Sequence, residues 1–115
     1  MDMVRQNRNI YIRFEVWLIN FDPAVGAETK KMRPAVIVSD TEMNKKLATV
    51  IVAPLASTIR NYPSRVLSDF GNQKGQVMLD QIKSVDKKRL VRKLGIIDDE
   101  EAFAISQVLE TMFAY

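Results

Sequence analysis

Apolar residues along this chain occur in short runs separated by residues that favour turns. Most runs are rich in β-branched or aromatic residues and are too short for helices, so they predict β-strands. The predicted strands cover residues 16–21, 35–38, 48–53 (ended by a proline) and 65–67, with one or two more over 76–85. About five to seven short, mostly antiparallel strands favour a small barrel over alternating βαβ units.

Two polar stretches between the strands carry turn signals: residues 40–46 predict a turn or one helical turn, and residues 70–75 predict a turn. The C-terminal segment changes to helical spacing. Asp98 and Glu101 are spaced as an N-cap and its third helical residue, and Ile105, Val108, Leu109 and Met112 recur on one face. We therefore expect an amphipathic helix on the sheet, and a mainly β (α+β) fold.

Three aromatic residues are expected in the core. Trp17 and Phe21 share one face of the first strand, and Phe103 lies near the start of the helix. The 115 residues suit one small domain, which we assign to residues 14–115, with residues 1–13 as a basic and polar extension.

The absence of cysteine and histidine excludes disulfides, thiolate zinc sites and Ser-His-Asp triads. Any acid–base chemistry must then use carboxylates, lysine, tyrosine or arginine, and we expect neither a metal nor a cofactor. No apolar run approaches the length of a membrane span, and no signal segment is apparent. We expect a soluble, cytoplasmic protein with no membrane contact.

Charge divides sharply along the chain. Residues 98–115 contain five acids and no Lys or Arg, which leaves a net charge of +8 on residues 1–97. A basic body favours phosphate-bearing partners, nucleic acid first among them, although an unevenly charged but ordinary surface gives the same pattern.

The segment from Asp22 to Pro34 is the strongest candidate for a site, because it joins two predicted strands and holds turn residues, two carboxylates and three cations. Pro34 restricts Arg33 to an extended conformation at the start of the second strand. A plain solvated loop is the alternative.

Several motifs then resemble one family in order and spacing. They are Val16-Trp-Leu-Ile-Asn-Phe-Asp-Pro, Gly26-Ala-Glu, Arg33-Pro-Ala-Val-Ile-Val-Ser, Val52-Ala-Pro-Leu-Ala-Ser, Gly75 and Asp80-Gln-Ile-Lys-Ser-Val-Asp. From about residue 15 to the final helix, the chain resembles the MazF/PemK toxins of bacterial toxin–antitoxin pairs.

The resemblance implies an SH3-like, plasmid-maintenance-toxin barrel, a homodimer and an acidic antitoxin partner. It also implies a metal-independent endoribonuclease that cleaves single-stranded RNA, often mRNA, through attack of the ribose 2′-hydroxyl, leaving a 2′,3′-cyclic phosphate. Such chemistry needs no histidine or cysteine, because the RNA supplies its own nucleophile.

The resemblance also suggests roles for individual residues. Arg33 matches the family's catalytic arginine, and Glu28 matches an acidic position that could act as a base. Ala56 stands where the family usually has a threonine, so Ser57 is the candidate replacement hydroxyl. The expected RNA-binding residues are Thr29, Lys30, Lys31, Thr58, Arg60, Tyr62, Gln81 and Lys83.

Two other functions stay open. One is a non-enzymatic poison of DNA gyrase, as in the related CcdB-type proteins, which the Glu28 and Arg33 loop argues against. The other is an inactive relative that binds only RNA or antitoxin, for which Ala56 is the main support.

Overall fold

The computed structural model describes residues 10–21 and 32–115. Its first two strands, β1 (Glu15–Asn20) and β2 (Met32–Ile37), form an antiparallel pair with Val16 opposite Val36. The predicted strands at 16–21 and 35–38 are confirmed, although β2 begins three residues earlier. Because β1 ends beside the start of β2, Arg33 lies on a strand instead of in the loop.

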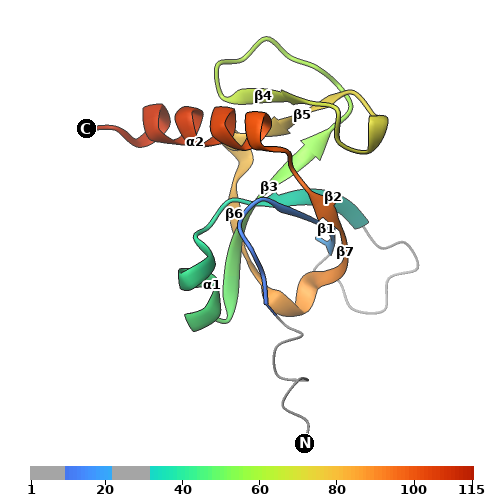
Figure 1. The fold of residues 1–115 in the computed structure, drawn as a ribbon, viewed down its shortest axis with the longest axis vertical. Helices are drawn as coiled ribbons and strands as arrows, with labels where there is room; N and C mark the ends of the chain where they lie inside the picture. The colour runs from blue at the N-terminus through green and yellow to red at the C-terminus, as the bar shows by residue number, and fades with distance from the viewer. Residues whose placement is uncertain (1–9, 22–31) are drawn as a thin grey trace, which may run out of the picture.

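Seven strands form one antiparallel sheet in the order β4-β5-β3-β2-β1-β7, with β6 paired to β3 outside that path (Figure 1). The remaining strands are β3 (Thr49–Ala56), β4 (Arg65–Ser68), β5 (Gly75–Met78), β6 (Lys83–Asp86) and β7 (Leu90–Ile96). Short 3₁₀ turns cover Phe70–Asn72, Leu79–Gln81 and Lys87–Arg89. The predicted fold class, mainly β with a C-terminal helix, is confirmed.

The long strand β3 connects the two parts of the curled sheet. Thr49 to Val52 pair with β6, whereas Leu55 and Ala56 pair with β5. Pro54 falls between these two pairings, so its missing N–H leaves a gap where the partner strand changes. The prediction that Pro54 ends the strand was therefore wrong.

Two α-helices complete the fold of the described residues. Residues 40–46 were predicted to form a turn or one helical turn, and they form the short helix α1 (Thr41–Lys46). Asp40 caps this helix, because its side chain accepts hydrogen bonds from two backbone amides. Its Asn44 is buried and donates to the carbonyl oxygens of Tyr11 and Ser39. This side chain ties α1 to the segment before β1.

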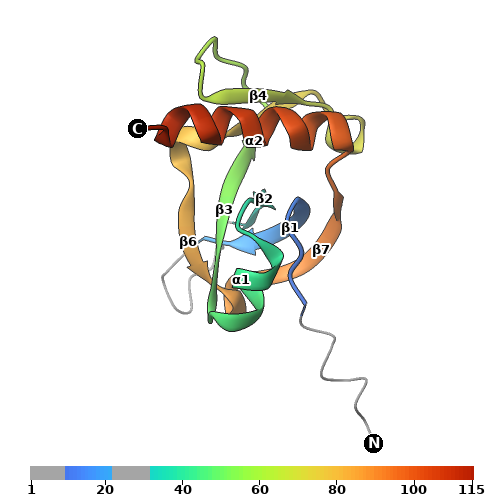
Figure 2. The same cartoon turned by 60° about the vertical axis from the view of Figure 1, so that its left-hand side comes forward.

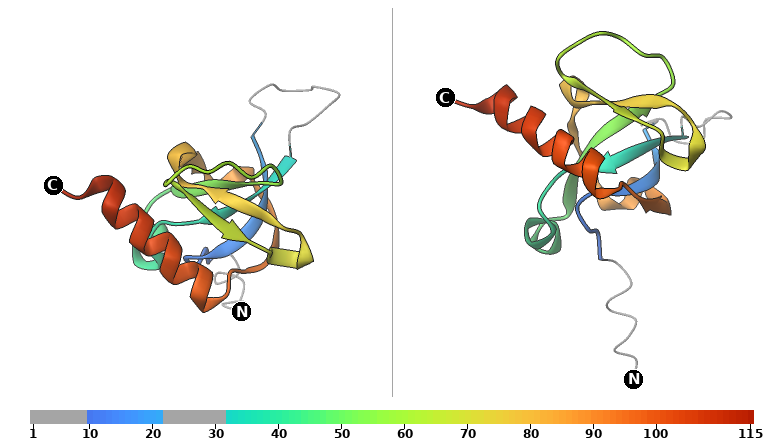
Figure 3. Two further views of the ribbon diagram at one scale, coloured as in Figure 1. Left: turned by 90° about the horizontal axis from the view of Figure 1, so that it is seen from above. Right: turned by 45° about the horizontal axis from the view of Figure 1, so that its top comes forward.

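The C-terminal helix α2 (Asp99–Phe113) lies against the β4–β5 end of the sheet (Figures 2 and 3). Asp98 caps it as predicted, accepting from the Glu101 amide at 2.9 Å. The Glu101 carboxylate accepts instead from the Asp69 amide, which joins the helix to the segment after β4. No helix in the described part of the chain is long and apolar enough to cross a membrane.

Two hydrophobic clusters form the core. The first lies between the sheet and α2, and the second lies among β1, β2, β3 and β6. The first contains Val16, Val36, Val38, Ala53, Val66, Val77, Leu79, Ile97 and Ile105, and the second Tyr11, Ile19, Ala35, Ile37, Val50, Val52, Val85 and Leu90. Trp17 and Phe21 pack on the second cluster as predicted. Phe103 was predicted wrongly: it is 65% exposed, because the buried stripe of α2 is centred on Ile105.

The sequence also failed to predict β7. Only Leu90 of its seven residues is buried, and Arg92 and Lys93 interrupt the apolar pattern. Among the described strands β7 pairs with β1 alone and forms an edge of the sheet, so most of its side chains need not be apolar.

Candidate functional site

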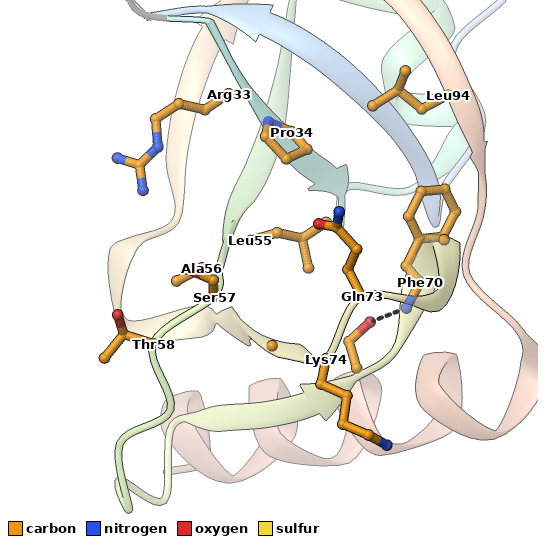
Figure 4. A pocket seen from close by; sticks show the side chains of 13 residues that line it. Arg33, Pro34, Leu55, Ala56, Ser57, Thr58, Phe70, Gln73, Lys74 and Leu94 are labelled. Atoms are coloured by element: carbon orange, nitrogen blue, oxygen red, sulfur yellow. Dashed lines mark hydrogen bonds between the residues drawn. The ribbon is translucent and has the colours of Figure 1, made fainter.

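A pocket of about 530 Å³ lies where the start of β2, the end of β3 and the connection between β4 and β5 meet (Figure 4). It is lined by Arg33, Pro34, Leu55, Ala56, Ser57, Thr58, Ser68, Phe70, Gly71, Gln73, Lys74, Gly75 and Leu94. This volume falls within the range of about 300–1,000 Å³ found for small-ligand pockets.

Charge at the pocket favours an anion, since the described residues that line it include two cations and no carboxylate. Arg33 is exposed, and within residues 10–21 and 32–115 nothing holds its guanidinium by a hydrogen bond or ion pair. The ammonium of Lys74 points toward α2 in Figure 4, away from Arg33. Among the residues that the structure describes, Arg33 is therefore the cation available to a ligand at its end of the pocket.

The hydroxyl groups of Ser57 and Thr58 line the pocket directly after β3, whereas the half-buried Ala56 offers none. Gly75 fixes the position of this segment. A Cβ atom at Gly75 would lie 2.3 Å from the Ala56 carbonyl oxygen, so only glycine lets the start of β5 approach β3 this closely.

One wall of the pocket is built by the turn between β4 and β5. The Phe70 amide donates a hydrogen bond to the Ser68 hydroxyl oxygen at 3.2 Å, and the Gln73 amide donates to the Phe70 carbonyl at 3.2 Å. The turn passes through Gly71 at φ +65°, a conformation that favours glycine. The Phe70 ring lies close against Gly95 of β7, where a Cβ would come within 2.9 Å.

Comparison with known proteins identifies the chain. The sequence pattern of the PemK-like, MazF-like toxins of type II toxin–antitoxin systems matches residues 12–113. The chain belongs to this family. It is 32% identical over 108 residues to endoribonuclease MazF9 of Mycobacterium tuberculosis, covering 85% of this chain and 92% of that protein. It is 30% identical to endoribonuclease EndoA of Bacillus subtilis, covering 89% and 93% of the two chains.

Solved structures of other family members share the fold of this MazF-like protein. A mycobacterial endoribonuclease in complex with its cognate antitoxin superposes with a TM-score of 0.73 at 25% identity, covering 88% of this chain and 92% of that one. A MazE–MazF structure from Deinococcus radiodurans gives a TM-score of 0.76 at 22% identity, covering 90% and 95%.

The structure brings three of the predicted site residues of this MazF-like chain to the pocket, namely Arg33, Ser57 and Thr58. Four others are outside its lining: Arg60, Tyr62, Gln81 and Lys83. Lys83 holds its ammonium 5.4 Å from the centre of the Phe21 ring. Glu28, Thr29, Lys30 and Lys31 lie outside the described residues.

Gln76, which the sequence reasoning overlooked, anchors the loop between β3 and β4. Its side chain is buried, accepts from the Arg60 amide at 3.0 Å and donates to the Arg60 carbonyl at 3.2 Å. A glutamine in the otherwise apolar run of β5 was the available signal. Both bonds are made to the backbone of residue 60, so the position of the loop does not depend on the side chain of that residue.

Arg65 completes this anchor. Its guanidinium binds Asp80 at 2.7 and 3.2 Å, donates to Gln76 at 2.9 Å and lies 4.8 Å from the centre of the Tyr62 ring. The hydrogen bonds from Arg65, followed by the one from Ser64, lower the pKa of Asp80 to about 2, while partial burial opposes the shift. The guanidinium of Arg65 therefore serves to stabilise the fold.

Within the described residues, no group of three or more Asp or Glu side chains could hold a metal ion.

Proposed function

We propose that this protein is the toxin of a type II toxin–antitoxin pair and acts as a metal-independent endoribonuclease on single-stranded RNA. Its family and its likeness to the endoribonucleases MazF9 and EndoA support the activity. The main structural support for a site is the exposed guanidinium of Arg33, at one end of a pocket whose described lining offers hydroxyls and no carboxylate.

The proposed reaction is an internal transfer within the RNA. The ribose 2′-oxygen attacks the adjacent phosphorus and forms a new O–P bond, while the bond from phosphorus to the 5′-oxygen breaks. The products are a 2′,3′-cyclic phosphate and a 5′-hydroxyl. The protein must hold the reacting atoms in line, accept the 2′ proton and stabilise the negative charge that develops on the phosphate.

Arg33 suits the last of these tasks, because its planar guanidinium can bind two phosphate oxygens together. Ser57 is proposed to donate a hydrogen bond to the same phosphate, in place of the hydroxyl that Ala56 lacks. Glu28 is the proposed base for the 2′ proton. These three residues form the proposed catalytic group.

RNA on either side of the cleaved bond would contact further side chains. Thr58 shares the pocket with Arg33. Tyr62 keeps 50% of its surface exposed, so a base can stack on it beside Arg65. The remaining proposed RNA contacts are Thr29, Lys30, Lys31, Arg60, Gln81 and Lys83.

Two protein partners belong to this proposal, a second copy of the chain and a cognate antitoxin. Residues 1–97 carry a net charge of +8, so an acidic, partly disordered antitoxin segment would bind the surface that RNA uses and exclude it. We place this pair in the bacterial cytoplasm, where its RNA substrate is made.

The decisive experiment incubates the purified protein with a long RNA in EDTA. Cleavage is expected in the unmodified protein and a loss of at least ~100-fold in Arg33→Ala, because one preorganised donor is typically worth this much. Lys46→Ala is the matched control, since Lys46 is an exposed cation of α1 outside the pocket lining. Intact RNA with the unmodified protein would contradict the proposal.

An inactive relative that only binds RNA or antitoxin is the second candidate, favoured by Ala56. In the same experiment it would retain RNA on a filter without cleaving it. A gyrase poison would instead produce gyrase-dependent cleavage of DNA.

A further inference from the structure

The pocket changes character from one end to the other. Figure 4 shows Arg33 and Thr58 toward one end and Phe70 and Leu94 toward the other, with the side chain of Gln73 between them. The first end offers a cation and hydroxyls, which suit a phosphate. The second is apolar, which suits the flat face of a base.

The apolar end is rigid. The Phe70 ring lies against the backbone of Gly95, and its own turn is closed by hydrogen bonds at Phe70, Asn72 and Gln73. The Asp69 amide also donates to Glu101 of α2 at 3.2 Å, which fastens the turn to the helix. A wall held on both sides in this way is preorganised for a ligand.

Gln73 is the polar group next to this wall. Its side chain is exposed, and in the described part of the chain no hydrogen bond engages its amide. An amide carries a donor and an acceptor side by side, the arrangement that binds adenine at its amino group and ring nitrogen together. The backbone N–H of Gln73 donates to the Phe70 carbonyl, and this bond fixes the position of the backbone that carries the side chain.

We propose that Gln73, with Phe70 and Leu94, forms a subsite for the base next to the cleaved phosphate, and that its amide selects adenine there. This inference rests on the proposed function, because it assigns a sequence preference to the same pocket. Gln73 is a specificity residue: it binds the base and takes no part in proton transfer.

The test maps the cleaved sequences of a long, mixed RNA for the unmodified protein and for Gln73→Glu and Gln73→Leu. Adenine should be preferred at one position beside the cleaved bond. Gln73→Leu should lose that preference by about 10-fold, and Gln73→Glu should move it toward cytosine, because a carboxylate accepts from the cytosine amino group. Gln107→Leu, on α2 outside this pocket, is the matched control and should leave the motif unchanged.

A second measurement separates this inference from the proposed function. Binding of short RNA oligomers with and without adenine is measured by fluorescence anisotropy, which needs no cleavage. If the unmodified protein cuts nothing yet prefers the adenine oligomer about 10-fold, and Gln73→Leu does not, the subsite stands and the nuclease activity fails. An identical motif in all variants, or equal binding of both oligomers, would overturn the subsite.

Discussion

The ion pair between Arg65 and Asp80 predicts a specific dependence of stability on pH. Asp80 accepts two hydrogen bonds from Arg65 and one from Ser64, and these bonds lower its pKa to about 2. The carboxylate is therefore more stable in the folded protein than in the unfolded chain. Asp80→Asn removes this charge while keeping the size and shape of the side chain.

The size of the effect follows from linkage between protonation and folding. A carboxyl whose pKa falls from 3.8 to about 2 on folding would stabilise the folded state by about 2 kcal/mol at neutral pH. Because 35% of the Asp80 side chain is exposed, screening by solvent reduces this to about 1 kcal/mol. The contribution is fully present above about pH 4 and is lost as the pH falls through 2.

The assay is urea unfolding of the unmodified protein and Asp80→Asn at several values between pH 7 and pH 2. The gap in unfolding free energy should narrow by about 1 kcal/mol over the lowest part of that range. Glu42→Gln is the control, because it breaks an ion pair with Lys45 in which both partners are well exposed and which contributes little at any pH. A gap that stays constant to pH 2 would refute the role assigned to the Asp80 charge.

Three further predictions concern the pocket and the core. Ser57→Ala should lower single-turnover RNA cleavage by about 100-fold and Ala56→Thr should restore it in that background; an unchanged rate in Ser57→Ala would exclude its hydroxyl. Gly75→Ala should cost about 1–3 kcal/mol in thermal unfolding, because its Cβ would meet the Ala56 carbonyl at 2.3 Å, and wild-type stability would contradict the close approach. Asn44→Ala should cost about 1–3 kcal/mol in urea unfolding by leaving two carbonyls without their donor; a cost below 0.5 kcal/mol, roughly the usual surface value, would argue against the buried network.

Much of the fold could be predicted from the sequence, because the central strands are short runs of apolar, often β-branched residues and the apolar residues of α2 recur at helical spacing. The N-cap Asp98 and the buried Ile105 follow directly from local rules. The strand β7 was not predicted, because an edge strand tolerates polar residues such as Arg92 and Lys93. Phe103 was misplaced because aromatic composition alone does not say which face of a helix meets the sheet.

The candidate site was predicted in part. Arg33 lies on β2 whereas Ser57 and Thr58 follow β3, and the family motifs were needed to link the two segments before the structure brought them to one pocket. Arg65 was placed in a predicted strand and beside Tyr62, but the sequence did not predict its bonds to Asp80 and Gln76. Gln73 lay within a recognised turn, but the direction of its side chain depends on how Phe70 packs against β7.

The anchor made by Gln76 has a consequence for how such proteins diverge. It holds residue 60 by the backbone N–H and carbonyl alone, so every amino acid except proline can occupy that position without loss of the anchor. Substitutions at Arg60 can therefore accumulate and change what the loop recognises while β3, β4 and β5 stay intact. New recognition properties can arise here with little cost in stability.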